Sequence, residues 1–480
     1  MKKNGIISSL FWKMFERGGR AVVELVVQIV MARLLAPEQF GMLSIMLVFV
    51  NLGNVVVQSG MNTAIIQAEH IERVDCSTVF WMSFIVSLAL YAMVFVAAPA
   101  IAGFYSSPGL VWPLRALALI LVINAYNAIQ VALITRELDM RKIFRATVAS
   151  SLASAVLGIS LALAGAGIWA LVAQQLSYQL INCLVHALQL DWRPQAEFST
   201  ESARRLFGFG SRLLVSSLLE QAYQSLSDLI IGRQFSTGEL GLVSQGKRYP
   251  QAIGSVLDGA IQPVMLSAVS RVQSDRAQVK RLVRRALKTS TFLVVPAMTL
   301  FSVVAPALVP VLLGAQWLEA VPFLQMYCFV YALLPVHSTN LQALNGMGRS
   351  DLFLRLELVK KAYGVAIVCF CAFVLKDVHL MVVGYMTSGV ISTFVNAWPN
   401  RHVIGYSYGE QVRDICPAFL ISAAAAVPAL LAASLPLDGL VLIVLQAVVF
   451  AAAYISVSAL LHVEAFVYLL NTFQDLFGGR

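Results

Sequence analysis

Residues 11–62 read FWKMFERGGRAVVELVVQIVMARLLAPEQFGMLSIMLVFVNLGNVVVQSGMN and predict two long apolar helices joined by a short turn that contains proline. The first helix carries charges where a membrane span is normally apolar. Because a helix turns by about 100° per residue, one face of it carries Lys13, Arg17, Arg20 and Glu24. A charge at the centre of a bilayer costs roughly 2.5–3.5 kcal/mol on insertion scales. This face should therefore meet a polar cavity or a charged partner instead of lipid.

The composition of the whole chain indicates a membrane protein with many spans. Of its 480 residues, 59% are hydrophobic and only 12% are charged, whereas a soluble protein carries about 25% charged residues. The net charge of +9 is typical of proteins that bind nucleic acid or an acidic membrane surface. Membrane topology explains the basic residues better, and we expect no nucleic-acid partner.

Apolar runs long enough to cross a bilayer predict fourteen membrane-spanning helices. They lie near residues 9–32, 40–67, 77–103, 111–135, 143–164, 167–189, 206–232, 240–270, 289–313, 319–345, 352–375, 378–399, 412–434 and 437–462. Basic residues are concentrated in the segments that this count places in the cytoplasm, as the positive-inside rule requires. The segments placed outside hold only Arg33, Arg115, Arg233 and Lys376. We therefore expect both termini in the cytoplasm.

An internal repeat relates two parts of the chain at an offset of 200 residues. ARLLAPEQFGMLS (32–44) aligns with GRQFSTGELGLVS (232–244), which matches Gly41 with Gly241. In the helix that follows, polar residues recur in step as Asn51 and Gln251, Gln58 and Asp258, and Asn62 and Gln262. An even number of spans in each repeat predicts parallel repeats. We expect an all-α fold with two six-helix lobes, each presenting the polar faces of its first two helices to a shared cavity.

The expected organisation along the chain follows from these two patterns. It comprises an N-lobe of helices 1–6 (1–190), a cytoplasmic linker (191–205), a C-lobe of helices 7–12 (206–400), two appended helices (401–462) and a cytoplasmic tail (463–480). The appended helices are nearly free of charge and are expected to face lipid. The tail has apolar residues near helical spacing, which is typical of a helix that lies on the membrane surface.

No pattern in the sequence is typical of a catalytic, metal or nucleotide site. The chain has no Cys-x-x-Cys motif, no Cys/His pair with metal-ligand spacing and no Walker A sequence. The six histidines lie mostly at the edges of loops, with His337 the exception inside a helix. We therefore expect neither an enzyme nor a bound metal or cofactor.

The charges within the spans are the remaining candidates for a site. The cations expected to line the cavity are Lys13, Arg17, Arg20, Arg212, Lys247, Arg248, Lys360 and Lys361. The acids that could bind a coupling ion or form ion pairs are Glu24, Glu220, Asp228 and Asp258. An excess of cations favours an anionic solute, and arginine suits bidentate phosphate recognition. For any single residue, an ion pair that fixes helix register remains an equal alternative.

Three segments resemble a known family: ARLLAPEQFGMLSI (32–45), MNTAIIQAEHI (61–71) and LLGAQWLEAVPFLQMYCFV (312–330). They are similar to the Wzx-type polysaccharide transporters of the multidrug/oligosaccharidyl-lipid/polysaccharide exporter superfamily, and the resemblance covers essentially the whole chain. It implies a flippase of the bacterial inner membrane that moves undecaprenyl-pyrophosphate-linked oligosaccharide repeat units to the periplasmic face. It also implies two lobes in a V around a cationic cavity, a role that Arg17, Arg20, Lys247 and Arg248 would fill here.

The resemblance further implies the partners of such a transporter. They are the lipid-linked oligosaccharide, membrane lipids, H⁺ or Na⁺ as the coupling ion, and the polysaccharide polymerase and co-polymerase. The alternative is a cation-coupled multidrug exporter of the same superfamily. That alternative requires an acidic, aromatic cavity for cationic drugs, and the excess of basic residues argues against it. A membrane glycosyltransferase or polymerase would need a large outside loop, and the segments expected outside are all short.

Overall fold

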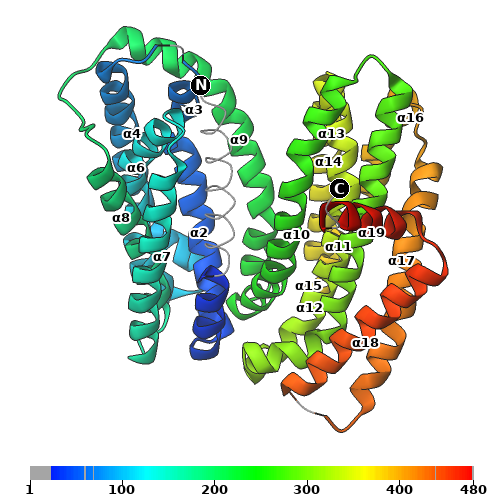
Figure 1. Cartoon of the computed structure of the whole chain (residues 1–480). Helices are drawn as coiled ribbons and strands as arrows, with labels where there is room; N and C mark the ends of the chain where they lie inside the picture. Colours follow the sequence, from blue (N-terminus) through cyan, green and yellow to red (C-terminus); the bar gives the residue numbers. More distant parts are fainter. Residues whose placement is uncertain (1–22, 59–60, 69, 438, 478–480) are drawn as a thin grey trace. The chain divides into compact units, whose positions relative to one another are not determined.

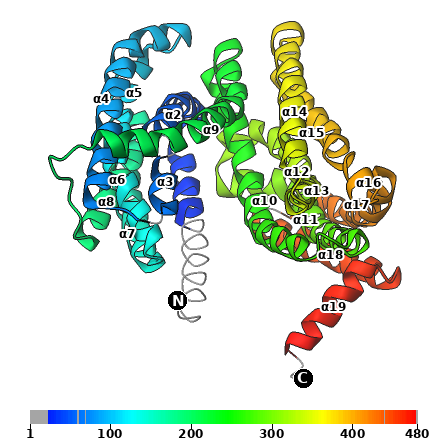
Figure 2. The same ribbon diagram turned by 90° about the horizontal axis from the view of Figure 1, so that it is seen from above.

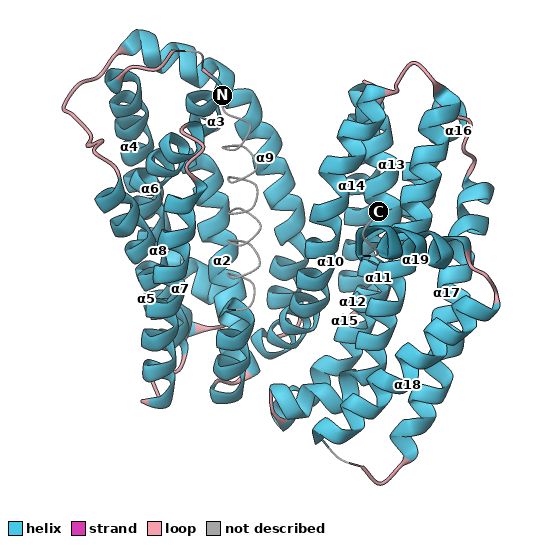
Figure 3. Ribbon diagram, in the orientation of Figure 1, coloured by secondary structure: helices cyan, strands magenta, loops and turns pink. Residues whose placement is uncertain are grey.

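The computed structural model describes residues 23–58, 61–68, 70–437 and 439–477, and within them the secondary structure is helical, with no strand (Figures 1 and 3). The side chains of a few residues inside helices, Arg212 and Asp258 among them, are also outside the described part. The chain divides into two compact units, Met1–Gly241 and Leu242–Arg480.

The first unit begins, within the described residues, with a helix over 23–34. The elements that follow are α2 (Pro37–Gln58), α3 (Met61–Gln67), α4 (Arg73–Phe104), η1 (Pro108–Leu110), α5 (Val111–Leu117), α6 (Leu119–Arg136), α7 (Met140–Leu163), α8 (Ile168–Gln189) and α9 (Thr200–Gln234). Helix α9 packs against α2, α3 and α4. Helix α9 follows the linker 191–205, at which we expect the boundary between the lobes, and it packs within the first unit. The position of the lobe boundary therefore stays a prediction.

The second unit contains nearly all of α10 (Thr237–Arg271) and the rest of the chain. Its other elements are α11 (Arg276–Leu312), η2 (Ala315–Ala320), α12 (Val321–Ala332), α13 (Leu334–Gly346), α14 (Ser350–Phe370), η3 (Cys371–Leu375), α15 (Val378–Ala397), α16 (Asn400–Val403), α17 (Tyr408–Leu431), η4 (Ala432–Ser434), α18 (Gly439–Leu460) and α19 (Glu464–Phe477). Helix α11 is central, because α12, α13, α17 and α18 all pack against it (Figure 2). Helix α19 runs across the direction of α17 and α18 (Figure 1).

Eleven helical segments of the described chain are long and apolar enough to cross a membrane. Each overlaps one of the expected spans. The three expected spans that are not among them are the one near 9–32, which lies largely outside the described residues, and the two that correspond to α9 and α10. These three carry most of the charges discussed above. The chain is a multi-pass, all-helical membrane protein, as predicted, and the count of fourteen spans stays a prediction.

Helix boundaries recur along the chain at fixed offsets. The helix over 23–34 and α9 end at Leu34 and Gln234, and α2 and α10 begin at Pro37 and Thr237, which is an offset of 200. Further along, α14 begins 210 positions after α7, and α15 begins 210 positions after α8. The offset of 200 thus recurs in the helix boundaries at one turn of each repeat, and the symmetry of whole lobes stays a prediction.

The turns that start α2 and α10 use different residues for the same purpose, which is to satisfy backbone N–H groups that have no partner within the helix. Proline opens α2, where its missing N–H costs nothing, and Gln39 Oε1 accepts a hydrogen bond from the N–H of Ala36 at 3.2 Å. At α10, Ser236 Oγ accepts from the N–H of Glu239 at 3.0 Å.

The two helix starts pack so closely that only glycine fits at their contact. A Cβ atom added to Gly41 would lie 1.7 Å from the carbonyl oxygen of Thr237, and one added to Gly241 would lie 1.9 Å from the carbonyl oxygen of Pro37. All four residues belong to the first unit. The two glycines are each other's counterparts in the repeat, so each is required for the same reason.

Replacing Gly41 by alanine should destabilise the protein, because the methyl group would force two backbones apart. Overpacking of this kind costs about 1–3 kcal/mol, and the midpoint of thermal unfolding of the detergent-solubilised protein should fall. Gly389→Ala is the matched control, since nothing lies within 4 Å of a Cβ at that position in α15. Alanine in an open helical position should leave stability unchanged or raise it by up to about 1 kcal/mol. Equal midpoints for the two variants would contradict the close contact.

Candidate functional site

The predicted site residues fall into three groups. Lys13, Arg17 and Arg20 lie outside the described residues, as do the side chains of Arg212 and Asp258. The first unit holds Glu24, Glu220 and Asp228. The second unit holds Lys247, Arg248, Lys360 and Lys361. No finding tests whether these side chains bind substrate, so that assignment stays a prediction.

In the first unit, the three acids are half-buried in helices that also carry other polar side chains. Glu24 lies one turn before Gln28, whose side chain is 4% exposed. On α9, Glu220 accepts a hydrogen bond from Gln224 Nε2 at 2.8 Å, and Asp228 follows one turn later. Helix α9 therefore has a polar row within a span-length helix, as the repeat predicts.

In the second unit, the four cations differ in how their charge is balanced. Lys247 and Arg248 are half-buried on α10. Lys360 forms an ion pair with Glu357 one turn earlier on α14, where the two side chains are 14% and 24% exposed. Lys360 thus makes the kind of pair that the sequence left open as an alternative. Lys361 is half-buried beside it. Lys247 and Arg248 stay candidates for an anionic ligand because they are half-buried within a span-length helix.

A buried polar network in the first unit was missed by the sequence analysis, which counted its histidine among those at loop edges. His186 is 1% exposed, and its Nδ1 lies 2.9 Å from Asn127 Oδ1. Asn127 in turn donates to Asn182 at 3.2 Å, and Asn182 donates to Ser150 at 3.2 Å. The network ties α6, α7 and α8 together. Its members are up to 59 residues apart in the chain, so spacing could not reveal it.

The second unit has a counterpart of this network with the two partners exchanged. His337 lies 210 positions after Asn127, and Asn396 lies 210 positions after His186. Asn396 Nδ2 and His337 Nδ1 are 3.1 Å apart. Both histidines therefore have a buried asparagine as partner, which favours a packing role for each. Because histidine and asparagine have exchanged positions between the two units, a residue-by-residue comparison of the two halves does not reveal that the two pairs correspond.

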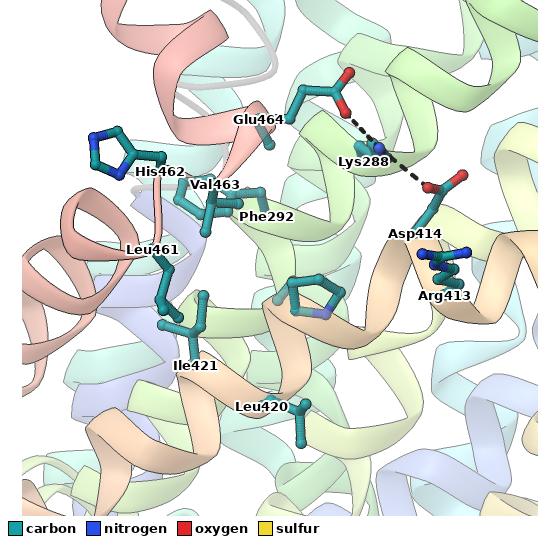
Figure 4. A pocket seen from close by; sticks show the side chains of 13 residues that line it. Lys288, Phe292, Arg413, Asp414, Leu420, Ile421, Leu461, His462, Val463 and Glu464 are labelled. Atoms are coloured by element: carbon teal, nitrogen blue, oxygen red, sulfur yellow. Dashed lines mark hydrogen bonds and ion pairs between the residues drawn. The ribbon is translucent and has the colours of Figure 1, made fainter.

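A third polar cluster joins α11 to α17 and α19. Lys280, Arg284 and Lys288 follow one another at intervals of four along α11, so they share a face. Arg284 makes two hydrogen bonds to Asp414, of 2.7 and 2.8 Å, and Lys288 lies 3.1 Å from the same carboxylate. Figure 4 shows Lys288 between Asp414 and Glu464, beside a cavity of about 470 Å³. The cavity has both acids and bases on its wall, and three of them, Lys288, Asp414 and Glu464, are joined in ion pairs.

Asp414→Ala should destabilise the protein strongly. The Asp414 side chain is 5% exposed, and it also accepts a hydrogen bond of 2.7 Å from Tyr406 Oη, so its removal leaves Arg284, Lys288 and Tyr406 without that partner. The expected cost is about 3 kcal/mol, measured as a lower midpoint of thermal unfolding in detergent. Glu464→Ala is the control, because the Glu464 side chain is 76% exposed and its pair should contribute at most about 1 kcal/mol. A larger fall in the unfolding midpoint for Glu464→Ala than for Asp414→Ala would contradict the central role of the Asp414 carboxylate in this cluster.

The charged and polar side chains within the helices are the candidate site groups of the described part of the chain. No group of three His, Cys, Asp or Glu residues could hold a metal ion there. In the second unit, the half-buried cations on α10 can solvate an anionic solute within a membrane. In the first unit, the polar rows on α9 and residues 23–34 can do the same for a hydroxyl-rich solute. Such an arrangement suits translocation of a polar group through a bilayer.

Comparisons with known proteins agree with this picture. Residues 30–322 match the model of a family described as "Polysaccharide biosynthesis protein". Among curated proteins, the chain is 24% identical over 350 residues to the succinoglycan biosynthesis transport protein ExoT of Rhizobium meliloti, covering 73% of this chain and 71% of ExoT.

Solved structures give the fold. The lipid II flippase MurJ, in an inward closed conformation, aligns with a TM-score of 0.74 over 95% of this chain and 99% of MurJ, at 14% identity. An inward-facing multidrug resistance MATE family transporter of the MOP superfamily aligns with a TM-score of 0.61 over 80% of this chain and 94% of that one, at 16% identity. The predicted all-α fold, similar to that of MurJ and of the MATE family transporter, is therefore confirmed, and the two symmetric six-helix lobes stay a prediction.

Proposed function

This chain belongs to the polysaccharide biosynthesis protein family, and we propose that it is a flippase for polyprenyl-pyrophosphate-linked oligosaccharide repeat units. It would move them across the bacterial inner membrane for the synthesis of exopolysaccharide, capsule or lipopolysaccharide. The observation that carries the proposal is the set of half-buried charges on α9, α10 and residues 23–34, in a chain that has eleven other segments apolar enough to cross a membrane among its described residues. The name of the relative ExoT, a succinoglycan biosynthesis transport protein, supports the substrate class.

The substrate explains why the charges are needed. A pyrophosphate carries negative charge, and an oligosaccharide presents many hydroxyl groups, so neither enters hydrocarbon without a large desolvation cost. Lys247 and Arg248, with Arg17, Arg20 and Arg212, would bind the pyrophosphate by charge-assisted hydrogen bonds. The polyprenyl tail is itself apolar and would remain in lipid. Alternating access of the two lobes would then expose the sugar on the periplasmic side.

Coupling to an ion gradient would drive transport in one direction. Glu24, Glu220, Asp228 and Asp258 are the candidate carriers of H⁺ or Na⁺. Carboxylates inside a membrane are costly unless paired, and they are typical of ion pathways. Each of these acids can release or take up one cation as its surroundings change between the two access states. The cations on α10 would attract the head group, and the acids would make release depend on the ion.

The distribution of basic residues supports the proposed orientation. Helices α11, α14 and α17 begin at one end of the second unit, and α13 and α15 end there, since residues of α11, α13, α14, α17 and of α16, which follows α15, share one hydrophobic core. We name this end, which holds the following residues, the basic end: Arg271, Arg276, Lys280, Arg281, Arg284, Arg285, Lys288, Arg349, Arg355, Arg401 and Arg413. The basic end would lie in the cytoplasm by the positive-inside rule, with both termini. There the protein could contact a polymerase and co-polymerase.

The alternative function is a cation-coupled multidrug exporter, for which the likeness to a MATE family transporter is the supporting observation. That fold is shared by both functions. Cationic drugs would require the acids to dominate the path, whereas Lys247 and Arg248 place positive charge on α10. The family match and the charge both favour the polysaccharide substrate.

Arg248→Ala should abolish polymer export in a strain that lacks its own copy of the gene, while membrane insertion and protein amount stay normal. Removing one charged contact to a phosphate costs about 2–3 kcal/mol, so surface polymer should fall at least tenfold. The readout is the quantity of polymer at the cell surface. Arg271→Ala is the control, because Arg271 is exposed at the last residue of α10.

Two outcomes would contradict the proposal. Normal polymer from the Arg248→Ala variant would show that this cation does not bind the head group. Sensitivity of the deletion strain to cationic drugs, with polymer unchanged, would favour the multidrug exporter instead.

A further inference from the structure

A second cavity lies at the basic end of the second unit, and its chemistry differs from that of the cavity in Figure 4. It has a volume of about 510 Å³. The residues of its wall that matter here are Arg276, Arg349, His402, Trp398, Met347 and Leu352. Among the described residues, no Asp or Glu lines it, and neither does any Asn, Gln, Ser or Thr. The wall is therefore basic on one part and apolar on the rest.

Three connections of the chain meet at this cavity. Arg276 is the first residue of α11, Arg349 lies in the turn between α13 and α14, and His402 lies on the short helix α16. The turn is held by Gly348, which has a φ of +72°, and by a hydrogen bond of 2.9 Å from the N–H of Arg349 to the carbonyl of Leu344. Val403, also on the wall, belongs to the buried core that includes Val279 and Tyr406. The floor of the cavity is thus fixed by core packing.

The basic side chains are exposed, and the nearby acids are already engaged. Arg349 pairs with Asp351 at 3.1 Å. Asp275 caps α11 by accepting a hydrogen bond of 3.0 Å from the N–H of Gln278. Arg276 is exposed at the first residue of α11. The wall itself thus carries two guanidinium groups and no carboxylate among the described residues, and the exposed guanidinium of Arg276 is accessible to an anion.

An exposed apolar stripe leads away from the cavity along α15. Trp398 is 49% exposed, and Phe394 and Ile391, at the preceding helical turns, are 41% and 40% exposed. Trp398 and Phe394 rings pack together with centroids 5.2 Å apart. Tryptophan is enriched where a membrane meets water. The side chains of α15 thus run from a basic cavity at the membrane surface into the region that faces acyl chains.

We propose that this cavity binds the phosphate headgroup of an anionic phospholipid of the cytoplasmic leaflet, whose acyl chains lie along Trp398, Phe394 and Ile391. Arg276 and Arg349 contact the phosphate, and His402 closes the site. Basic pockets between helices on the cytoplasmic side recognise lipid headgroups in this way. The site is separate from the proposed translocation path and does not depend on flippase activity, although the choice of leaflet rests on the orientation proposed above.

The composition of the wall selects a phospholipid over the other phosphate-bearing ligands. A lipid-linked oligosaccharide needs amide and hydroxyl side chains to hydrogen-bond its sugars, and the described wall has none. Free phosphate would gain nothing from the apolar part of the wall. A phospholipid with one phosphate and two acyl chains uses both the arginines and the stripe.

The test measures lipid binding to the purified full-length protein by native mass spectrometry. The probes are phosphatidylglycerol, which is anionic, and phosphatidylcholine, which is zwitterionic. We expect the wild-type protein to retain phosphatidylglycerol in preference, and the double variant Arg276→Gln/Arg349→Gln to bind it about tenfold more weakly. Arg355→Gln is the matched control, because Arg355 is exposed on α14 but does not line the cavity; its lipid binding should equal that of the wild type.

A second measurement locates the lipid. Phosphatidylglycerol brominated on its acyl chains should quench tryptophan fluorescence in the wild type, and that part of the quenching should disappear in Trp398→Phe. Unfolding midpoints of all variants confirm that they are folded. The proposal is overturned if Arg355→Gln loses as much binding as the double variant. It is also overturned if inorganic phosphate or undecaprenyl pyrophosphate displaces phosphatidylglycerol from the site at equal concentration.

Discussion

The constraint on which the structure depends is that a charge cannot face the hydrocarbon of a bilayer at an acceptable energy. Most expected spans of this chain obey it by being apolar throughout, and their few polar groups are paired inside a unit. His186 with Asn127 and His337 with Asn396 are examples. Helices α9 and α10 do not obey it, since each carries acidic and basic side chains along its length. In the proposed function those two helices border the polar head group of the transported lipid, which would offset that cost.

The same constraint explains why the fold could be predicted well from the sequence. Spans of about twenty apolar residues have only one stable backbone conformation in lipid, so the segments recognised by hydropathy correspond to the helices observed. The repeat could also be recognised in the sequence, because a close backbone contact requires glycine at both Gly41 and Gly241. Features that rest on backbone sterics or on the polarity of whole segments leave a clear trace in a sequence.

Features that depend on contacts between side chains far apart in the chain leave no such pattern in the sequence. Asn127, the partner of His186, is 59 residues away in the chain. The buried carboxylate of Asp414 forms ion pairs with Arg284 and Lys288, about 130 residues before it. Lys360 is a different case, because its partner Glu357 lies only three residues away. The sequence left both an ion pair and a role in the substrate path open for Lys360, and the structure shows the ion pair. Whether a cation inside a span binds substrate or balances a neighbour depends on rotamers and packing, and neither has a sequence pattern. The roles of Arg17 and Arg20 accordingly stay predictions.

The central claim is that the protein moves a pyrophosphate-linked glycolipid because its path is cationic. The most direct measurement reconstitutes the purified protein in vesicles that contain a fluorescent polyprenyl-pyrophosphate oligosaccharide, and follows the fraction of the label that an impermeant quencher can reach. The account predicts rapid exchange of this lipid between leaflets, and no acceleration for a neutral glycolipid with the same tail and sugars but no phosphate. Equal rates for the two lipids, or a rate no faster than in protein-free vesicles, would contradict it.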